Sequence, residues 1–159
     1  MPAIRPSSVR DHALVSAIAA AMLVGSPGAD AASVADIVQK YGLTGTWATD
    51  CAKPPGRENP HVVYQLLDAE RLQREIKIVP DQNLDVSVAL SIVETGPGEI
   101  TMTWKTGEGG ITNRVRAEPR QMQVLESTRD NGEKISANGR RIRDNAETLI
   151  FRKCARPAA

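Results

Sequence analysis

The sequence has few of the residues from which enzyme and metal sites are most often built. Its 159 residues include two histidines, two cysteines and five aromatic side chains. His12 lies near the N-terminus, and His61 is the one histidine of the remaining chain. A metal site with several histidines is therefore excluded there, and a Ser-His-Asp triad could be built only around His61. The sequence also lacks a Cys-x-x-Cys pair and a Gly-rich phosphate loop before a helix. We therefore expect no catalytic activity, no metal and no cofactor.

An excess of charge of one sign is also missing. The chain carries 20 basic and 19 acidic side chains, a formal net charge of +1. Because only five aromatic residues are available for base stacking, this balance argues against nucleic-acid binding. Residues 32–110 hold 7 basic and 11 acidic side chains, whereas residues 111–159 hold 11 and 6. Two interpretations are open: the basic side chains pair with acidic neighbours in the fold, or they form an anion-facing patch.

No apolar run is long enough to span a bilayer. The run Ala13–Gly25 has 13 residues, whereas a transmembrane helix needs about 20. Arg5 and Arg10 precede this run and the small residues of Ala29–Ala31 follow it, as in a secretory signal peptide. We expect residues 1–31 to be such a peptide, cleaved at its end, and the protein to be periplasmic or secreted, without a stable membrane span.

The two cysteines lie near the ends of the expected mature chain. Residues 32–159 are enough for one domain, and Cys51 and Cys154 fall close to its start and its end. Export to an oxidising compartment makes a disulfide the expected state of such a pair. The alternative, a reactive thiol or a metal ligand, needs a neighbouring base or second ligand that the sequence does not supply.

One short helix is expected before a series of strands. Ser33 and Asp36 have the spacing of a capping box, and Val34–Tyr41 has apolar residues at helical spacing before Gly42. From Leu43 onward the apolar period changes to two, and turn signals recur about every ten residues. This pattern predicts an all-β domain of eight or nine short strands.

An antiparallel up-and-down barrel of about eight strands is the expected architecture, with a β-sandwich as the alternative. Closing the sheet removes its two exposed edges and gives its apolar face a common interior. The predicted disulfide would then join the first and last strands. From the alternation of apolar and polar residues we expect one strand to turn five apolar side chains inward: Leu84, Val86, Val88, Leu90 and Ile92.

A barrel interior offers a candidate binding cavity. Its predicted lining consists of the larger inward-facing side chains: Trp47, Arg74, Ile76, Val88, Met102, Trp104 and Phe151. The two tryptophans fit equally well as core or end-plug residues. Arg74 lies on an otherwise apolar face, where it would pair either with a ligand carboxylate or with an acidic neighbour.

The one long connection, Cys51–Pro60, is rich in proline and is excluded from a sheet. It supplies the residues of a possible interaction loop: Pro54, Pro55, Arg57, Asn59 and His61. We expect His61, at the start of the next strand, to form a hydrogen bond with this loop and to hold it in place.

The segment Leu43–Trp47 resembles the Gly-x-Trp start of lipocalin-type barrels. That resemblance implies a tryptophan closing one barrel end and an interior that binds a small apolar ligand. The same segment resembles the periplasmic inhibitors of bacterial metalloproteases, although these close a much shorter disulfide loop. Together with Asp50-Cys51, Pro54, Asn59-Pro60-His61 and Lys153-Cys154, it is also similar to small exported proteobacterial proteins that have no assigned activity.

The function expected from these features is the binding of a small apolar or amphipathic ligand by an exported barrel. The alternative is a protein-interaction module or protease inhibitor of the cell envelope, contacting its partner through the N-terminal helix, the proline-rich loop or the basic C-terminal third. The two hypotheses differ in whether the fold offers a cavity of ligand size.

Overall fold

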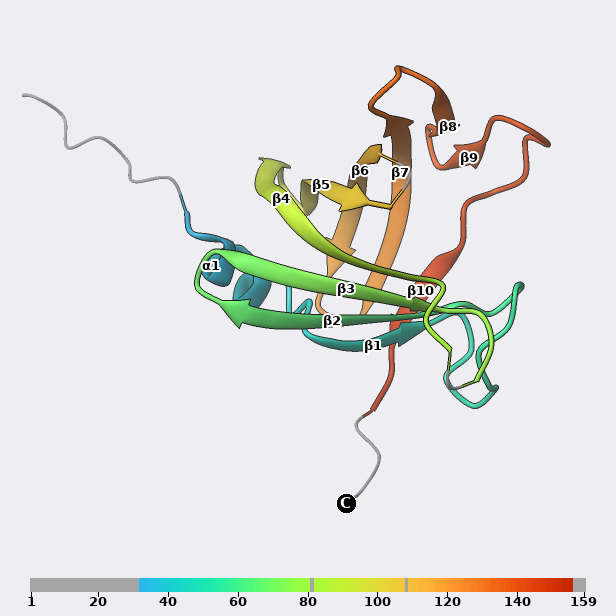
Figure 1. The fold of residues 1–159 in the computed structure, drawn as a ribbon, viewed down its shortest axis with the longest axis horizontal. Coiled ribbons are helices and arrows are strands. Elements are labelled where there is room, and N and C mark those ends of the chain that lie inside the picture. Colours follow the sequence, from blue (N-terminus) through green and yellow to red (C-terminus); the bar gives the residue numbers. More distant parts are fainter. Residues whose placement is uncertain (1–31, 81, 108, 156–159) are drawn as a thin grey trace, which may run out of the picture. The chain divides into compact units, whose positions relative to one another are not determined.

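A ring of eight antiparallel strands forms the body of the protein (Figure 1). The computed structural model describes residues 32–80, 82–107 and 109–155, and the predicted signal peptide lies outside them. The elements, in chain order, are α1 (Val34–Lys40), β1 (Gly45–Ala48), β2 (His61–Asp68), β3 (Arg71–Lys77), β4 (Asp85–Gly96), β5 (Glu99–Thr106), β6 (Gly109–Glu118), β7 (Gln121–Arg129), β8 (Lys134–Ala137), β9 (Arg140–Arg141) and β10 (Ile150–Lys153).

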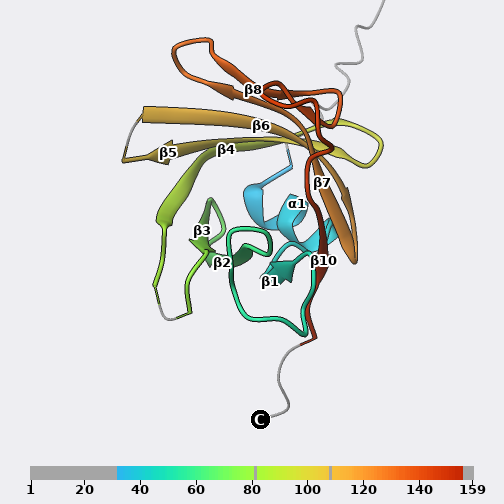
Figure 2. The same ribbon diagram turned by 90° about the vertical axis from the view of Figure 1, so that its right-hand side faces the viewer.

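The last strand closes the ring. Strands β1 to β7 pair in chain order, and β10 pairs with both β1 and β7. Figure 2 shows these eight strands arranged around α1, while β8 and β9 continue from β7 outside the ring. The all-β barrel prediction is therefore confirmed, and the sandwich alternative is wrong.

Helix α1 fills one end of the barrel. The Ser33 hydroxyl accepts a hydrogen bond from Asp36 N, and the Asp36 carboxylate accepts one from Ser33 N, which completes the predicted capping box. Ile37, Val38 and Tyr41 are buried against the strands. The backbone N–H of Ala35 also donates to Ala69 O, in the β2–β3 turn. The apolar face of α1 is thus part of the core, and it is not available to a partner.

The core beside α1 is filled with large side chains. The largest fully buried ones are Trp47, Trp104, Leu43, Leu72, Ile100, Met102 and Val115. The indole Nε1 of Trp47 donates a 2.7 Å hydrogen bond to Leu43 O, so this buried polar group is paired. Large buried side chains therefore occupy the interior near α1.

The predicted faces of β4 are wrong over most of its length. Ser87 and Ala89 are buried, whereas Val86 and Leu90 are exposed, and Val88 lies between the two buried residues on the outward side. A bulge then inserts one extra residue between Ala89 and Ser91, which changes the phase and turns Ile92 inward as expected. Val88 therefore does not face the barrel interior.

The predicted disulfide between Cys51 and Cys154 is confirmed. Cys51 follows β1 and Cys154 follows β10, and their Cα atoms lie 5.4 Å apart. The bond therefore ties together the two strands whose pairing completes the ring.

Loss of this disulfide is expected to lower the free energy of unfolding by about 4 kcal/mol, because the bond closes a loop across a sequence separation of 103 residues. The test is urea denaturation of the Cys51→Ser/Cys154→Ser double variant beside the oxidised wild type. An unchanged midpoint and slope would contradict the prediction. Reduced wild type serves as the control, and it should match the double variant.

A hydrogen-bonded carboxylate fastens α1 to the end of β4. Lys40 Nζ lies 2.7 Å from a Glu94 carboxylate oxygen, and the Tyr41 hydroxyl donates a 2.9 Å hydrogen bond to the same carboxylate. These two donors hold the pKa of the Glu94 carboxyl below its ordinary value of 4.5. The contribution of Glu94 to stability is therefore present above pH 4.5 and is lost as the pH falls through the lower, folded-state pKa.

The Glu94→Gln variant should accordingly melt at a lower temperature than wild type at pH 7, and the difference should shrink to zero as the pH falls below the folded-state pKa of Glu94. Thermal melts between pH 2.5 and pH 7 measure this. The matched control is Glu118→Gln, which removes an exposed carboxylate at the end of β6. A pH-independent difference for Glu94→Gln would mean that the carboxylate charge does not stabilise the docked helix.

Candidate functional site: the open mouth of the barrel

A cavity of about 650 Å³ lies at the end of the barrel opposite α1. Antiparallel neighbours alternate in direction, so the β2–β3 and β4–β5 turns lie beside α1 and the connections after β3, β5 and β7 meet at the other end. In Figure 2 these three connections lie along the left-hand side, from β3–β4 at the lower left to β7–β8 at the upper left. The residues that line the cavity are Arg74, Ile76, Leu84, Asp85, Val86, Thr106, Gly107, Gly110, Ile111, Arg129, Asp130, Asn131 and Ile135. We call this cavity the mouth.

The mouth combines apolar and charged side chains. Ile76, Ile111 and Ile135 are half-buried in its wall, and Leu84 and Val86 are exposed at its rim. Its volume lies in the range of about 300–1,000 Å³ that small-molecule sites occupy. The mouth is therefore large enough for a small molecule and amphipathic in lining.

Arg74 is fixed in the wall of the mouth by three neighbours. Its Nη2 donates a 2.9 Å hydrogen bond to Asp85 Oδ2, and its Nε donates a 3.2 Å bond to Ser87 Oγ. Its guanidinium carbon lies 4.5 Å from the centre of the Trp104 ring. The side chain is only 8% exposed, and Asp85 neutralises its charge. Of the two predicted partners for Arg74, the structure thus contains the acidic neighbour; a role toward a ligand stays a prediction.

A second set of contacts ties two of the mouth's turns together. Asp130 Oδ2 accepts a 2.8 Å hydrogen bond from Gly110 N, and Asp130 N donates to Gly110 O at 3.0 Å. At Gly109, with φ +124°, a Cβ would lie 2.8 Å from the same carboxylate oxygen. The glycine pair therefore allows the β7–β8 turn to approach the start of β6 closely.

The structure divides the predicted ligand-binding residues into two groups. Arg74 and Ile76 line the mouth. Trp47, Met102, Trp104 and Phe151 are core residues that do not line it, and Val88 faces outward. The rest of the mouth is formed by other residues, most of them near strand ends. Their positions depend on long-range strand pairing, which the alternation of apolar and polar residues does not predict.

Three buried polar residues next to the mouth were not predicted. Asn113, Ser127 and Ser136 are 8%, 6% and 3% exposed. In the sequence, Asn113 interrupts the apolar series formed by Ile111 and Val115, and this is the signal by which it could have been found. We refer to Asn113, Ser127 and Ser136 as the inner polar cluster.

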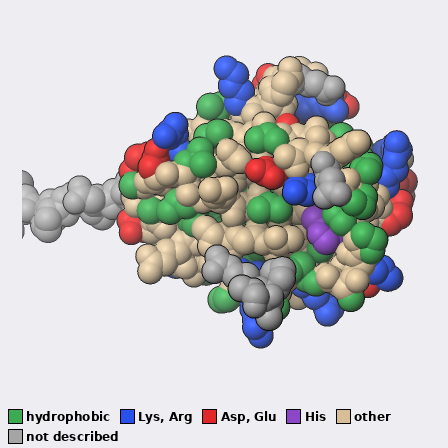
Figure 3. Space-filling model, turned by 60° about the horizontal axis from the view of Figure 1, so that its bottom comes forward, with side chains coloured by type: hydrophobic (Ala, Val, Ile, Leu, Met, Phe, Trp, Pro, Cys, Tyr) green, Lys and Arg blue, Asp and Glu red, His purple; other side chains and the backbone are tan. Residues whose placement is uncertain are grey.

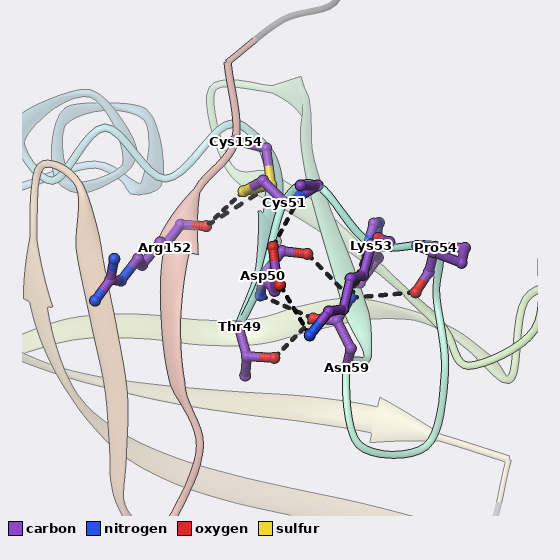
Figure 4. The surroundings of a disulfide bond; sticks show 10 residues. Thr49, Asp50, Cys51, Lys53, Pro54, Asn59, Arg152 and Cys154 are labelled. Atoms are coloured by element: carbon purple, nitrogen blue, oxygen red, sulfur yellow. Dashed lines mark hydrogen bonds and ion pairs between the residues drawn. A yellow bond between two sulfur atoms is a disulfide. The ribbon is translucent and has the colours of Figure 1, made fainter.

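The predicted interaction loop is held by Asn59 (Figure 4). Asn59 Oδ1 accepts hydrogen bonds from Thr49 Oγ1 at 2.6 Å and from Asp50 N at 2.9 Å. Its Nδ2 donates to the backbone oxygens of Asp50, Lys53 and Pro54. Asn59 is buried, so its side chain organises the loop from within and is not presented to a partner.

Other residues of the loop lie at its surface. The ring Nε2 of His61 lies 3.0 Å from Lys53 O, which is the loop contact predicted for this histidine. Pro54 and Arg57 are exposed, and Pro55 is half-buried. A partner for these residues remains a prediction.

Two arginines of the basic C-terminal third, Arg114 and Arg116, pair with carboxylates on neighbouring strands. Arg114 donates to Glu99 at 2.7 Å and lies 3.1 Å from Glu126, and it holds the pKa of the Glu126 carboxyl below its ordinary value. Arg116 also contacts Glu99, at 3.5 Å. On the face in Figure 3, hydrophobic side chains lie in small groups, and charged side chains of both signs lie mainly around the edge. The first interpretation of the charge pattern therefore applies to this group.

No helix among residues 32–80, 82–107 and 109–155 is long and apolar enough to cross a membrane. In the same residues, no group of three or more His, Cys, Asp or Glu side chains is placed to hold a metal ion.

Comparison of the chain with protein-family models, with curated proteins and with solved structures finds no match. The barrel agrees with the architecture that the lipocalin-type resemblance implies. The functional argument therefore depends on the geometry of the mouth.

Replacing Asp85 by Asn is expected to lower the free energy of unfolding by about 2 kcal/mol, because it leaves the buried Arg74 guanidinium without its counter-charge. The estimate lies below the usual cost for a fully buried pair because Asp85 is 22% exposed. Asp68→Asn is the matched control, since the Asp68–Arg71 pair is exposed and its loss should cost less than about 1 kcal/mol. Equal losses in urea denaturation would contradict the argument.

Proposed function

We propose that the protein is an exported binding module that holds a small amphipathic molecule in the mouth of its barrel. The observation that carries the proposal is the cavity of about 650 Å³ at the end opposite α1. The proposed site differs from the interior site expected from the sequence, because the large side chains beside α1 fill that interior.

The apolar rim of the mouth supports this proposal. Leu84 is 63% exposed and Val86 is 53% exposed, although both line the cavity. A ligand seated against them and against the three isoleucines of the wall would remove apolar surface from water, which contributes about 25 cal/mol per Å². The charged side chains at the same cavity favour a ligand with a polar part as well as an apolar part.

The mouth is also held in place before a ligand arrives. Leu84 N donates a 2.7 Å hydrogen bond to Ile76 O across the β3–β4 connection, and the Asp130–Gly110 bonds fix the turns on the other side. A preformed site of this kind loses little conformational entropy on binding.

Binding, and not catalysis, is proposed because the charged side chains of the mouth already have partners. Arg74 pairs with Asp85, Asp130 binds a backbone N–H, and Arg129 lies 3.6 Å from Glu133. Such groups are well placed to shape a site, and they are less free to transfer protons. Export, to the periplasm or beyond the cell, is proposed on the signal-peptide pattern, and the disulfide supports it.

The alternative, an interaction module or protease inhibitor, has less support. The apolar face of α1 is buried, and the proline-rich loop is fixed by Asn59 and the disulfide. Exposed Pro54 and Arg57 remain available for a partner, but no apolar groove adjoins them among the cavities described. The mouth therefore carries the proposal.

Binding is tested by titration with N-phenyl-1-naphthylamine, a neutral probe whose fluorescence rises in apolar surroundings. We expect saturable binding, and we expect Leu84→Asp to weaken it by at least fivefold, about 1 kcal/mol, because the change puts a charge on the apolar rim.

Leu90→Asp is the matched control. Leu90 is 65% exposed and lies on β4 outside the mouth, so this variant should bind the probe as wild type does. Absence of saturable binding, or a loss in Leu90→Asp in place of Leu84→Asp, would refute a site at the mouth.

A further inference from the structure

The inner polar cluster occupies three neighbouring strands. Asn113 on β6 is the cross-strand partner of Ser127 on β7, and Ser127 is the partner of Ser136 on β8. Asn113 is also opposite Met102, a core residue, so the cluster lies on the inward side of the barrel. Side chains of directly opposed residues lie on the same face with Cβ atoms about 5 Å apart. The three polar groups therefore form one small patch on the inner wall.

One hydrogen-bonding group of this patch, the Ser136 hydroxyl, is buried and unpaired. The side chains of Asn113 and Ser127 make no hydrogen bond to any residue in the described part of the chain. Buried polar groups are nearly always paired, and leaving one unpaired is costly, so Ser136 Oγ calls for a partner from outside the chain.

The patch lies one step inward from the mouth. Ile111 and Arg129 line the mouth and are cross-strand partners of each other. Ile111 comes two residues before Asn113 on β6, and Arg129 comes two residues after Ser127 on β7. Two residues along a strand correspond to about 7 Å. The Arg129 side chain is 49% exposed, and its ion pair with Glu133 is 3.6 Å long, so it can swing out of the way of an entering group. The three residues of the cluster do not themselves line the mouth, so a ligand group that reached them would have to pass Ile111 and Arg129.

We propose that the inner polar cluster is the subsite that recognises an uncharged hydrogen-bonding group of the ligand, one that both donates and accepts, such as a primary amide. This inference rests on the proposed function of the mouth and deepens it. The amide of Asn113 and the two serine hydroxyls together offer donors and acceptors and no net charge. A charged group at this depth would lack a counter-ion, because Arg74 is already neutralised by Asp85.

The test uses two competitors with the same eight-carbon acyl chain. Octanamide carries N–H donors beside its carbonyl, whereas methyl octanoate carries the carbonyl without them. Displacement of N-phenyl-1-naphthylamine from wild type should require at least fivefold less octanamide than methyl octanoate. In the Ser136→Ala and Asn113→Leu variants this preference should disappear, while the affinity for methyl octanoate stays within twofold of wild type.

Ser91→Ala is the matched control, because it removes an exposed hydroxyl from β4, away from the cluster, and it should keep the wild-type preference. The ligand-free Ser136→Ala variant should melt no lower than wild type, since its lost hydroxyl had no partner. A clearly lower melting temperature would mean that internal water or a protein group satisfies Ser136, and it would overturn the subsite.

The remaining outcomes separate the two proposals. Equal displacement by octanamide and methyl octanoate would overturn the subsite and leave the mouth as a general apolar site. Preferential displacement by octanoate would also overturn it, because that result points to recognition of an anion by the arginines. Failure of the probe and of every competitor to bind would overturn the proposed function itself.

Discussion

The pairing of β10 with both β1 and β7 is the constraint on which the rest of the structure depends. It turns a sheet with two free edges into a ring with one interior. The ring closes with a stagger, because β10 pairs with β7 only over Gln121–Gln123, and the later part of β7 pairs with β8 at Ser127. β7 and β10 therefore separate toward the end opposite α1, which is the end that holds the mouth.

The two ends of the barrel consequently have different roles. At one end, α1 and Trp47 complete a packed core, and the capping box, the Glu94 contacts and the Trp47 hydrogen bond each fix part of that closure. At the other end, polar residues replace the core: the Arg74–Asp85–Ser87 group on β3 and β4, and the inner polar cluster across the barrel. A gradient from apolar core to polar wall along one interior is an arrangement suited to an amphipathic molecule.

Much of this architecture could be predicted from local signals, and the failures have a common cause. The capping box, the turn residues, the strand count and the cysteine pair depend on nearby residues or on compartment chemistry. The faces of β4 depend on the bulge at Leu90 and on apolar side chains that point outward, and the alternation of apolar and polar residues in the sequence shows neither.

The site was less predictable for the same reason. Arg74 was singled out because it broke an apolar pattern, and Asn113 breaks one in the same way. The turns of the mouth come together only through pairings between distant strands. Residues in them, such as Asp130 and Asn131, carry no sign of their role in the sequence.

The order in which the chain is made adds a kinetic consequence to the position of the closing strand. β1 is among the first elements of the barrel and β10 is its last, and the cysteines beside them are separated by 103 positions. Contacts between such distant segments form slowly, because a long loop must be closed first. No closed ring can exist until nearly the whole chain is available, so the chain stays open throughout synthesis. An open chain of this kind is the form that can be threaded through a narrow channel.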